Sequence, residues 1–154
     1  MPPSAALTEA LADHGIPFET LEHERTDRAV DEAVALGLEP HDVAKTVVVT
    51  SGERNVRILL PASERLDMHK LRELFEAQEL RLLTESELEE RYPEFELGAV
   101  PPIGGPDDEL IIDQRISGRR RVVFEAGSHD CSIKVDATDL VSLSRARVAD
   151  VCAD

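Results

Sequence analysis

Residues 41–49 read His41-Asp42-Val43-Ala44-Lys45-Thr46-Val47-Val48-Val49. β-branched and apolar residues dominate this run, which is typical of a strand in a protein core. A second apolar run, Val56 to Leu60, follows after Ser51-Gly52-Glu53-Arg54-Asn55, a segment rich in turn formers. The two runs therefore predict a β-hairpin with strands over residues 43–50 and 56–60.

Lys45 stands near the start of the first predicted strand. The chain has only three lysines, Lys45, Lys70 and Lys134, against fourteen arginines. A chain so rich in arginine would carry arginine at an indifferent cationic position. We therefore interpret Lys45 as selected for its compact ammonium group, which suits a phosphate or a carbonyl oxygen. The alternative is a lysine whose stem covers the end of the strand.

Helical and strand patterns alternate around the hairpin. Helices are expected over residues 4–14, 28–36, 68–77, 85–91 and 137–143, and further strands over 18–23, 80–83, 110–113, 122–125 and 132–135. Capping residues precede four of the helices: Ser4, Thr26, Thr84 (with Glu87 completing a capping box) and Asp136. The pattern predicts an α+β fold, a mixed, largely antiparallel curled sheet or barrel with helices packed outside. Residues 1–143 are expected to form one domain and residues 144–154 a polar C-terminal tail.

Composition narrows the class of function. Aromatic residues make up 3% of the chain, too few for a base-stacking platform. The net charge of −15 speaks against broad contact with nucleic acid, so no DNA partner is expected. Neither a secretory signal nor an apolar run of about 20 residues is visible, so we expect a cytoplasmic protein without a membrane partner. Cys131 and Cys152 are expected to be reduced thiols.

Four arginines cluster around a predicted turn, Arg115 to Arg121. This turn is the candidate for contacts with phosphate groups. The alternative interpretation is a solvated hairpin tip.

Standard catalytic patterns are absent from the sequence, which has no GxSxG, Walker loop, HExxH or CxxC. The five histidines show no metal-ligand spacing, so neither a metal nor a cofactor is expected. Three elements remain: Lys45, the loop Gly98-Ala99-Val100-Pro101-Pro102 with its continuation Ile103-Gly104-Gly105, and Gly127-Ser128-His129. Glycines let a backbone approach a ligand and prolines fix its direction, so the loop can supply oxyanion-type donors. The structural alternatives are a turn that covers a barrel end and, for His129, a hydrogen-bonded loop residue.

The order of these elements resembles the YbaK family, also called the prolyl-tRNA synthetase associated domain. The resemblance rests on Glu22-His23, on Val43-Ala44-Lys45-Thr46 entering a hairpin, on Gly98 to Gly104, and on Ala126-Gly127-Ser128-His129 followed by Ile133. It implies an editing deacylase, free-standing or attached to a synthetase, that hydrolyses the ester of mischarged aminoacyl-tRNA. The typical substrate of such domains is tRNA(Pro) carrying alanine or cysteine.

The resemblance also implies roles for individual residues. Lys45 matches the hallmark lysine, which would hold the 3′-terminal phosphate or the aminoacyl ester, and with Gly98 it forms the expected catalytic pair. Substrate-binding residues are expected at Ala99, Val100, Pro101, Pro102, Ile103, Gly104, Gly127, Ser128, His129 and His23. The expected partners are the acceptor end of mischarged tRNA and a prolyl-tRNA synthetase. A water, helped by groups of the substrate itself, would attack the ester.

Two positions depart from the cysteine-specific members of the family. Ala44 stands where they carry an aromatic residue, and Ser132 where they carry an aspartate. The amino acid that is removed therefore stays open. The alternative function is a non-catalytic binding module of the same fold, which recognises an aminoacyl-like or nucleotide-like ligand or a protein. Lys45→Ala separates the two, because only an enzyme has deacylation to lose.

Overall fold

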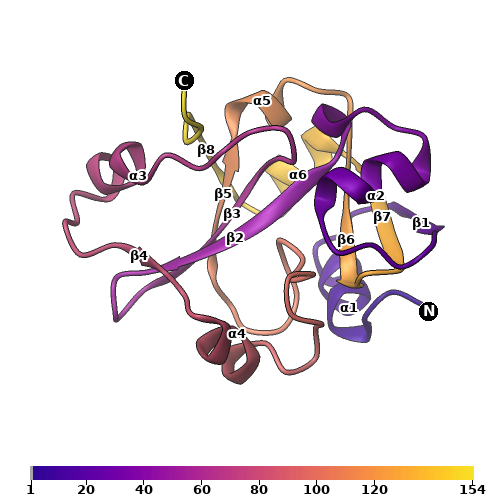
Figure 1. The fold of residues 1–154 in the computed structure, drawn as a ribbon, viewed down its shortest axis with the longest axis horizontal. Coiled ribbons are helices and arrows are strands. Elements are labelled where there is room, and N and C mark those ends of the chain that lie inside the picture. The colour runs from indigo at the N-terminus through magenta and orange to yellow at the C-terminus, as the bar shows by residue number, and fades with distance from the viewer. Residues whose placement is uncertain (1) are drawn as a thin grey trace.

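The computed structural model describes residues 2–154, whose strands form two sheets (Figure 1). β2 (Ala44–Thr50) and β3 (Asn55–Pro61) make the predicted hairpin. They lie within the larger sheet, which has the order β4 (Arg81–Leu82), β2, β3, β5 (Glu109–Asp113), β8 (Arg147–Ala149). β2 pairs antiparallel with β3 and β4, whereas β3, β5 and β8 run parallel.

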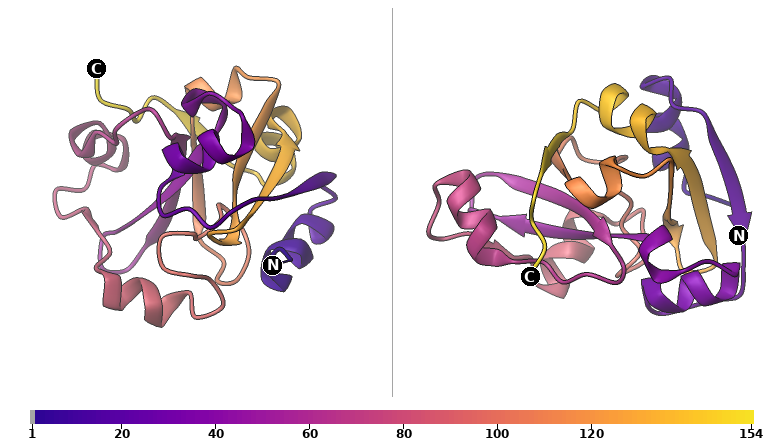
Figure 2. Two further views of the ribbon diagram at one scale, coloured as in Figure 1. Left: turned by 45° about the vertical axis from the view of Figure 1, so that its right-hand side comes forward. Right: turned by 90° about the horizontal axis from the view of Figure 1, so that it is seen from above.

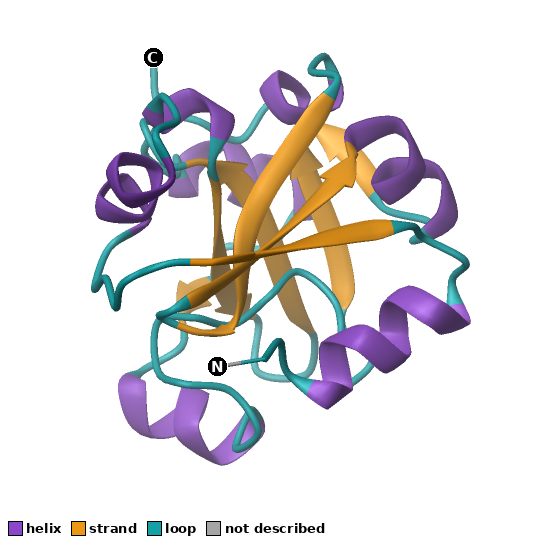
Figure 3. Cartoon of the chain, turned by 90° about the vertical axis from the view of Figure 1, so that its right-hand side faces the viewer, coloured by secondary structure: helices purple, strands orange, loops and turns teal. Residues whose placement is uncertain are grey.

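The smaller sheet is antiparallel throughout, in the order β1 (Phe18–Glu22), β7 (Cys131–Asp136), β6 (Arg121–Ser128). Helices surround the strands in Figure 3. They are α1 (Ala5–Asp13), α2 (Ala29–Leu36), α3 (Met68–Phe75), α4 (Glu85–Arg91), α5 (Gln114–Ser117), α6 (Ala137–Leu143) and the 3-10 turn η1 (Pro40–Asp42). None of the helices within residues 2–154 is long and apolar enough to cross a membrane.

The α+β class and the mixed, largely antiparallel pairing are confirmed, but the strands form two sheets instead of one curled sheet. The two sheets meet at a single bridge between Val43 and Val123 and do not close into a barrel. A sequence pattern shows which segments are strands without showing which strands pair, so this division was not predicted.

The β2–β3 hairpin is shared by two hydrophobic cores because its side chains alternate between the faces of the sheet. Leu59 packs with Phe124 and Ile133 of the smaller sheet. Its neighbours Ile58 and Leu60 pack on the other side, with residues of α3 and the C-terminal segment. Along its length, the hairpin has α2 toward one end and α3 toward the other (Figure 2). The start of β2 lies at the junction between the two sheets.

The prediction of a polar tail over residues 144–154 is wrong. β8 pairs with the edge of β5, and Val151 and Cys152 are fully buried in the core beside β3. The carboxylate of Asp113 accepts a hydrogen bond from the Val151 amide at 3.0 Å. Polar residues separate these few apolar ones, so the local pattern does not reveal burial that depends on a strand far away in sequence.

The turn over Arg115 to Arg121 is not a hairpin tip either, because β5 and β6 belong to different sheets. Asp113 caps the short helix α5 by accepting the amide hydrogen of Arg115, and α5 then leads the chain from one sheet to the other. Arg115 and Arg119 form ion pairs with Asp150 and Asp42. Two of the four arginines are therefore already partly neutralised.

Candidate active site

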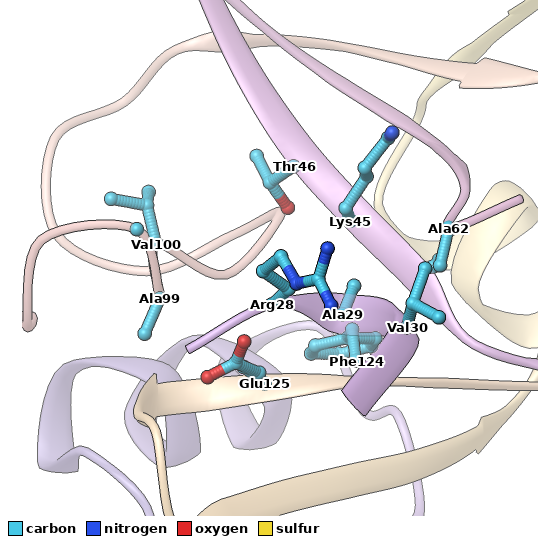
Figure 4. Close-up of a pocket in the computed structure, with 12 residues that line it drawn as sticks. Arg28, Ala29, Val30, Lys45, Thr46, Ala62, Ala99, Val100, Phe124 and Glu125 are labelled. Atoms are coloured by element: carbon cyan, nitrogen blue, oxygen red, sulfur yellow. The ribbon is translucent and has the colours of Figure 1, made fainter. Parts of the chain in front are cut away.

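A cavity of about 340 Å³ lies where the start of β2, the beginning of α2, the loop before β5 and strand β6 meet (Figure 4). Its volume falls at the lower end of the range for small-molecule sites. Its lining comes from Arg28, Ala29, Val30, Ala44, Lys45, Thr46, Ala62, Gly98, Ala99, Val100, Phe124 and Glu125. The segment from Gly98 to Gly105 is called the glycine–proline loop below. Its first three residues therefore share one site with Lys45, although the loop and Lys45 are far apart in sequence.

Lys45 reaches this site from β2, where it is half-buried opposite Leu60. Within residues 2–154 no acidic side chain forms an ion pair with it. Burial lowers the pKa of its ammonium group. In Figure 4 the ammonium points away from Glu125 and Ala99. Lys45 thus carries an unneutralised charge at one side of the cavity, where water is partly removed and attraction to an anion is stronger.

The glycine–proline loop forms the opposite wall. Gly98 has a φ of +86°, which favours glycine, and Ala99 after it is fully buried. The Ala99 amide donates to the carbonyl of Glu96 at 3.0 Å. The amides of Gly98 and Val100 have no hydrogen-bond partner among residues 2–154. These two amides are therefore available to a ligand in or near the cavity.

His129 supports this loop from behind and does not line the cavity. Its Nε2 lies 2.7 Å from the carbonyl oxygen of Leu97. A Cβ added to Gly98 would lie 3.4 Å from its ring. A carbonyl oxygen can only accept, so Nε2 carries the hydrogen, and a neutral ring then presents a bare Nδ1 on its other side.

Arg57 holds the second half of the loop. This arginine on β3 is 1% exposed, and it donates to the carbonyl oxygens of Pro101, Gly104 and Pro106 at 2.9, 2.6 and 3.0 Å. It also pairs with the buried carboxylate of Asp108 at 2.8 Å. A planar guanidinium can satisfy several acceptors at once, so Arg57 fixes the course of the chain after Val100. Sequence reasoning missed it, although an arginine inside an apolar strand was the available signal.

Glu125 is the acidic group of the cavity. It lies on β6 and is 8% exposed, and Figure 4 shows its carboxyl group between Ala99 and Arg28. Burial, reinforced by the negative charges of Glu32 and Glu96, raises its pKa to about 9. Sequence reasoning missed Glu125 as well, although an acid after Val122-Val123-Phe124 was a visible departure from an apolar strand.

A second buried acid, Glu32, lies on α2. Burial raises its pKa to about 7. The Ser132 hydroxyl donates to its carboxyl group, and Nε2 of His23 lies 2.9 Å from the same hydroxyl oxygen. This chain of contacts ties α2 to β7 and to the end of β1, and His23 is part of it without lining the cavity.

The remaining predicted residues lie elsewhere. Pro101 and Pro102 are buried, and Pro102, Ile103 and Gly104 line a separate hollow beside α1. Gly127 packs so closely that an added Cβ would lie 2.8 Å from Ser4, and the Ser128 hydroxyl donates to Asp130. The structure therefore brings Lys45, Gly98, Ala99 and Val100 together. The lining residues that were not predicted as site residues are Arg28, Ala29, Val30, Ala44, Thr46, Ala62, Phe124 and Glu125.

The family model of the aminoacyl-tRNA editing domain matches residues 23–143, a span that contains every residue of the cavity lining. The chain belongs to the aminoacyl-tRNA editing domain family. This confirms the resemblance to YbaK proteins. A search of curated proteins finds no significant match.

Solved structures agree with this editing-domain fold. One is the crystal structure of a candidate trans-editing enzyme for prolyl-tRNA synthetase, with 26% identity and a TM-score of 0.88 over 100% of this chain and 99% of that one. The hypothetical protein APE2540 is 24% identical, with a TM-score of 0.85 over 93% of this chain and 96% of its own. A structure from Marinobacter aquaeolei VT8, 19% identical with a TM-score of 0.75, contains the fold in 31% of a longer chain.

Within residues 2–154 of this editing domain, no group of three His, Cys, Asp or Glu side chains is placed to hold a metal ion. Cys131 and Cys152 are buried free thiols outside the cavity lining. The polar groups that the cavity offers to a ligand are thus Lys45, Arg28, Thr46, Glu125 and the loop amides.

Proposed function

We propose that this protein is an aminoacyl-tRNA deacylase that acts in trans on mischarged tRNA, in particular tRNA(Pro) carrying a small non-cognate amino acid. The observation that carries the proposal is the shared cavity, with the unpaired Lys45 on one side and the loop Gly98–Val100 on the other. A cation and a loop with two unbonded backbone amides line one cavity, a combination that suits an ester whose alcohol part carries phosphate.

The reaction needs little from side chains. A water oxygen attacks the ester carbonyl carbon, the C–O bond to the 3′-terminal ribose breaks, and the ribose oxygen takes up a proton to release the free amino acid. Loop amides would stabilise the negative charge that develops on the carbonyl oxygen. Lys45 would hold the terminal phosphate, so that the ester stays in place. Apart from Thr46, no hydroxyl, thiol or imidazole side chain lines the cavity.

A small acyl group fits the lining best. Ala29, Ala44, Ala62 and Ala99 contribute methyl groups to a cavity of about 340 Å³. One additional methylene in such a pocket changes binding by only ~1–3 kcal/mol. Rejection of cognate prolyl-tRNA therefore requires that the proline ring clash with this wall or lose a polar contact that a primary amine makes.

The acidic surface limits how the tRNA is held. With a net charge of −15, attraction to a long stretch of phosphates is weak, so contact is limited to the acceptor end. A prolyl-tRNA synthetase would supply the remaining contacts with the tRNA. The structural likeness to a candidate trans-editing enzyme for that synthetase supports this partner.

Deacylation of a tRNA(Pro) panel charged with alanine, cysteine, serine or proline tests the proposal. The wild-type protein should release one or more small non-cognate residues and spare proline, and Lys45→Ala should lose this activity. Lys134→Ala is the matched control, since Lys134 pairs with Glu19 outside the cavity. Binding of a charged tRNA without faster ester loss than in buffer would instead support a binding module.

A further inference from the structure

Glu125 is a buried carboxyl group with one close polar neighbour, the ring of His129, and no well-formed hydrogen bond. Its side chain is 9% exposed, and its Oε2 makes no hydrogen bond of good geometry. The nearest basic atom, Nδ1 of His129, lies 2.8 Å away and is likewise without a well-formed hydrogen bond. Removing a carboxyl group from water without a compensating partner destabilises the protein, so such a group calls for an explanation.

Nearby cations do not supply the missing partner. Arg25 is engaged with Glu96 through two hydrogen bonds of 2.6 and 3.2 Å. Arg28 lines the same cavity but forms its ion pair with Asp31. Apart from His129, the other charged groups that act on Glu125 are the acids Glu32, Glu96 and Asp27. The free protein therefore keeps on the cavity wall a carboxyl group whose burial is compensated only by its contact with His129, and a cationic ligand group would supply a further partner.

We propose that Glu125 binds the α-ammonium group of the aminoacyl ester, so that the substrates of this site are esters of amino acids with a free α-amino group. The inference rests on the proposed function and names the class of acyl group on which it acts. An alanyl or seryl ester has one cationic group, and that group lies on the carbon next to the ester carbonyl.

The placement of the cavity groups agrees with such a substrate. Glu125 and Ala99 both line the cavity, and in Figure 4 the Lys45 ammonium points away from both. A carbonyl held at the loop would thus have the α-amine on the Glu125 side and the ribose and phosphate on the Lys45 side. The protons also balance, since a protonated Glu125 that meets a neutral amine passes its proton to that amine and forms the ion pair without exchange with water.

The test compares two esters on the same tRNA(Pro), alanyl and N-acetylalanyl, because acetylation removes the charge and leaves the ester in place. Each enzymatic rate is divided by the spontaneous hydrolysis rate of the same ester, since an ammonium group itself activates the carbonyl. The wild-type protein should favour the alanyl ester by about tenfold or more, the range of a hydrogen bond to a charged group. In Glu125→Gln this preference should fall toward one.

A second measurement keeps the inference testable if the variant folds poorly. Amide-linked alanyl-adenosine, which cannot be hydrolysed as an ester, should compete with substrate for the wild-type protein better than its N-acetyl derivative. Equal normalised rates for the two esters, or equal competition by the two amides, would overturn the role of Glu125 while leaving deacylation intact. Failure to hydrolyse any ester would instead overturn the proposed function itself.

Discussion

Nδ1 of His129 lies 2.8 Å from Oε2 of Glu125, while Nε2 of the same ring lies 2.7 Å from the carbonyl oxygen of Leu97. One imidazole thus connects the acid of the cavity wall with the residue that precedes Gly98. We therefore expect a change in the charge or position of Glu125 to reach the start of the loop through this ring. This connection makes His129 a positioning residue in the proposed reaction.

Replacing His129 by alanine should free the loop at Leu97 and lower kcat/KM for deacylation by roughly 10²-fold, the scale expected when reacting groups shift by about 1 Å. His129→Gln, whose side-chain amide can still donate to the carbonyl, should restore part of the activity. Steady-state deacylation with both variants measures the effect, beside thermal unfolding to separate stability from positioning. Equal losses in the two variants would argue against a role for the donor at Nε2.

Gly98→Ala should destabilise the protein by about 1–2 kcal/mol because of its φ of +86°, and should also abolish most deacylation. The added methyl group would lie 3.4 Å from the His129 ring and push the loop. Gly52→Ala is the matched control, since Gly52 has a φ of +99° with open space around it and lies in the β2–β3 turn. The control should lose similar stability but retain deacylation. If both variants lose activity alike, the effect is one of folding alone.

Removing the Arg57 guanidinium should cost about 1–3 kcal/mol of unfolding free energy, because Arg57→Met leaves the loop carbonyls without their donor, whereas Asp108 keeps Arg91 and Tyr92. Chemical denaturation measures this loss. Arg54→Met, which removes an exposed pair with Glu109 just before the start of β3, should change stability far less. Similar values for the two variants would mean that the loop does not depend on Arg57.

Stability should fall as the pH rises from about 5 to about 9, owing to Glu125. Its pKa is raised from 4.5 to about 9 in the folded protein, so the folded state binds more protons than the unfolded state across this range. The contribution is fully present below the unfolded value and is lost as the pH rises through the folded value, with a slope of at most ~1.4 kcal/mol per pH unit. The charged groups around this carboxyl are Glu32, Glu96, Arg25, Asp27 and His129.

Denaturation at several pH values checks this trend, and Glu125→Gln should flatten it. Glu32, whose pKa is raised to about 7, should retain a smaller slope below neutrality in that variant. Glu89→Gln on the exposed side of α4 serves as the control. An unchanged slope in Glu125→Gln would show that Glu125 is ionised throughout.

Local signals in the sequence predicted part of the local structure. Thr84 and Glu87 form the expected capping box, and Asp136 caps α6 as expected. The predictions for Ser4 and Thr26 are wrong, because Ser4 makes no capping hydrogen bond and Arg28 stands at the N-cap of α2. The β2–β3 hairpin also matches, since its turn and both apolar runs lie within twenty residues. Such features depend on neighbours along the chain, which a single sequence displays directly.

Features that depend on distant partners were not predictable in the same way. Glu125 is buried near Glu32, 93 positions earlier in the chain (125 − 32), and no local pattern shows that proximity. Arg57 divides the loop into a half that faces the cavity and a half that faces α1, although the glycines and prolines look continuous in sequence. The order of motifs located the site, and three-dimensional packing decided which members of each motif enter it.

The walls of the cavity are anchored in different ways. On one side, Glu125 lies on β6, and the buried side chains of His129 and Arg57 hold the loop. On the other side, Ala29 and Val30 come from the first turn of α2. α2 is held further along its length, by the buried contact of Glu32 with Ser132 and by the packing of Ala33 against Val43 and Val123. Mutations in the first turn of α2 can therefore resize the cavity while the opposite wall keeps its geometry. Single substitutions at Ala29 or Val30 would thus alter which acyl group fits, while the residues proposed to act on the ester keep their places.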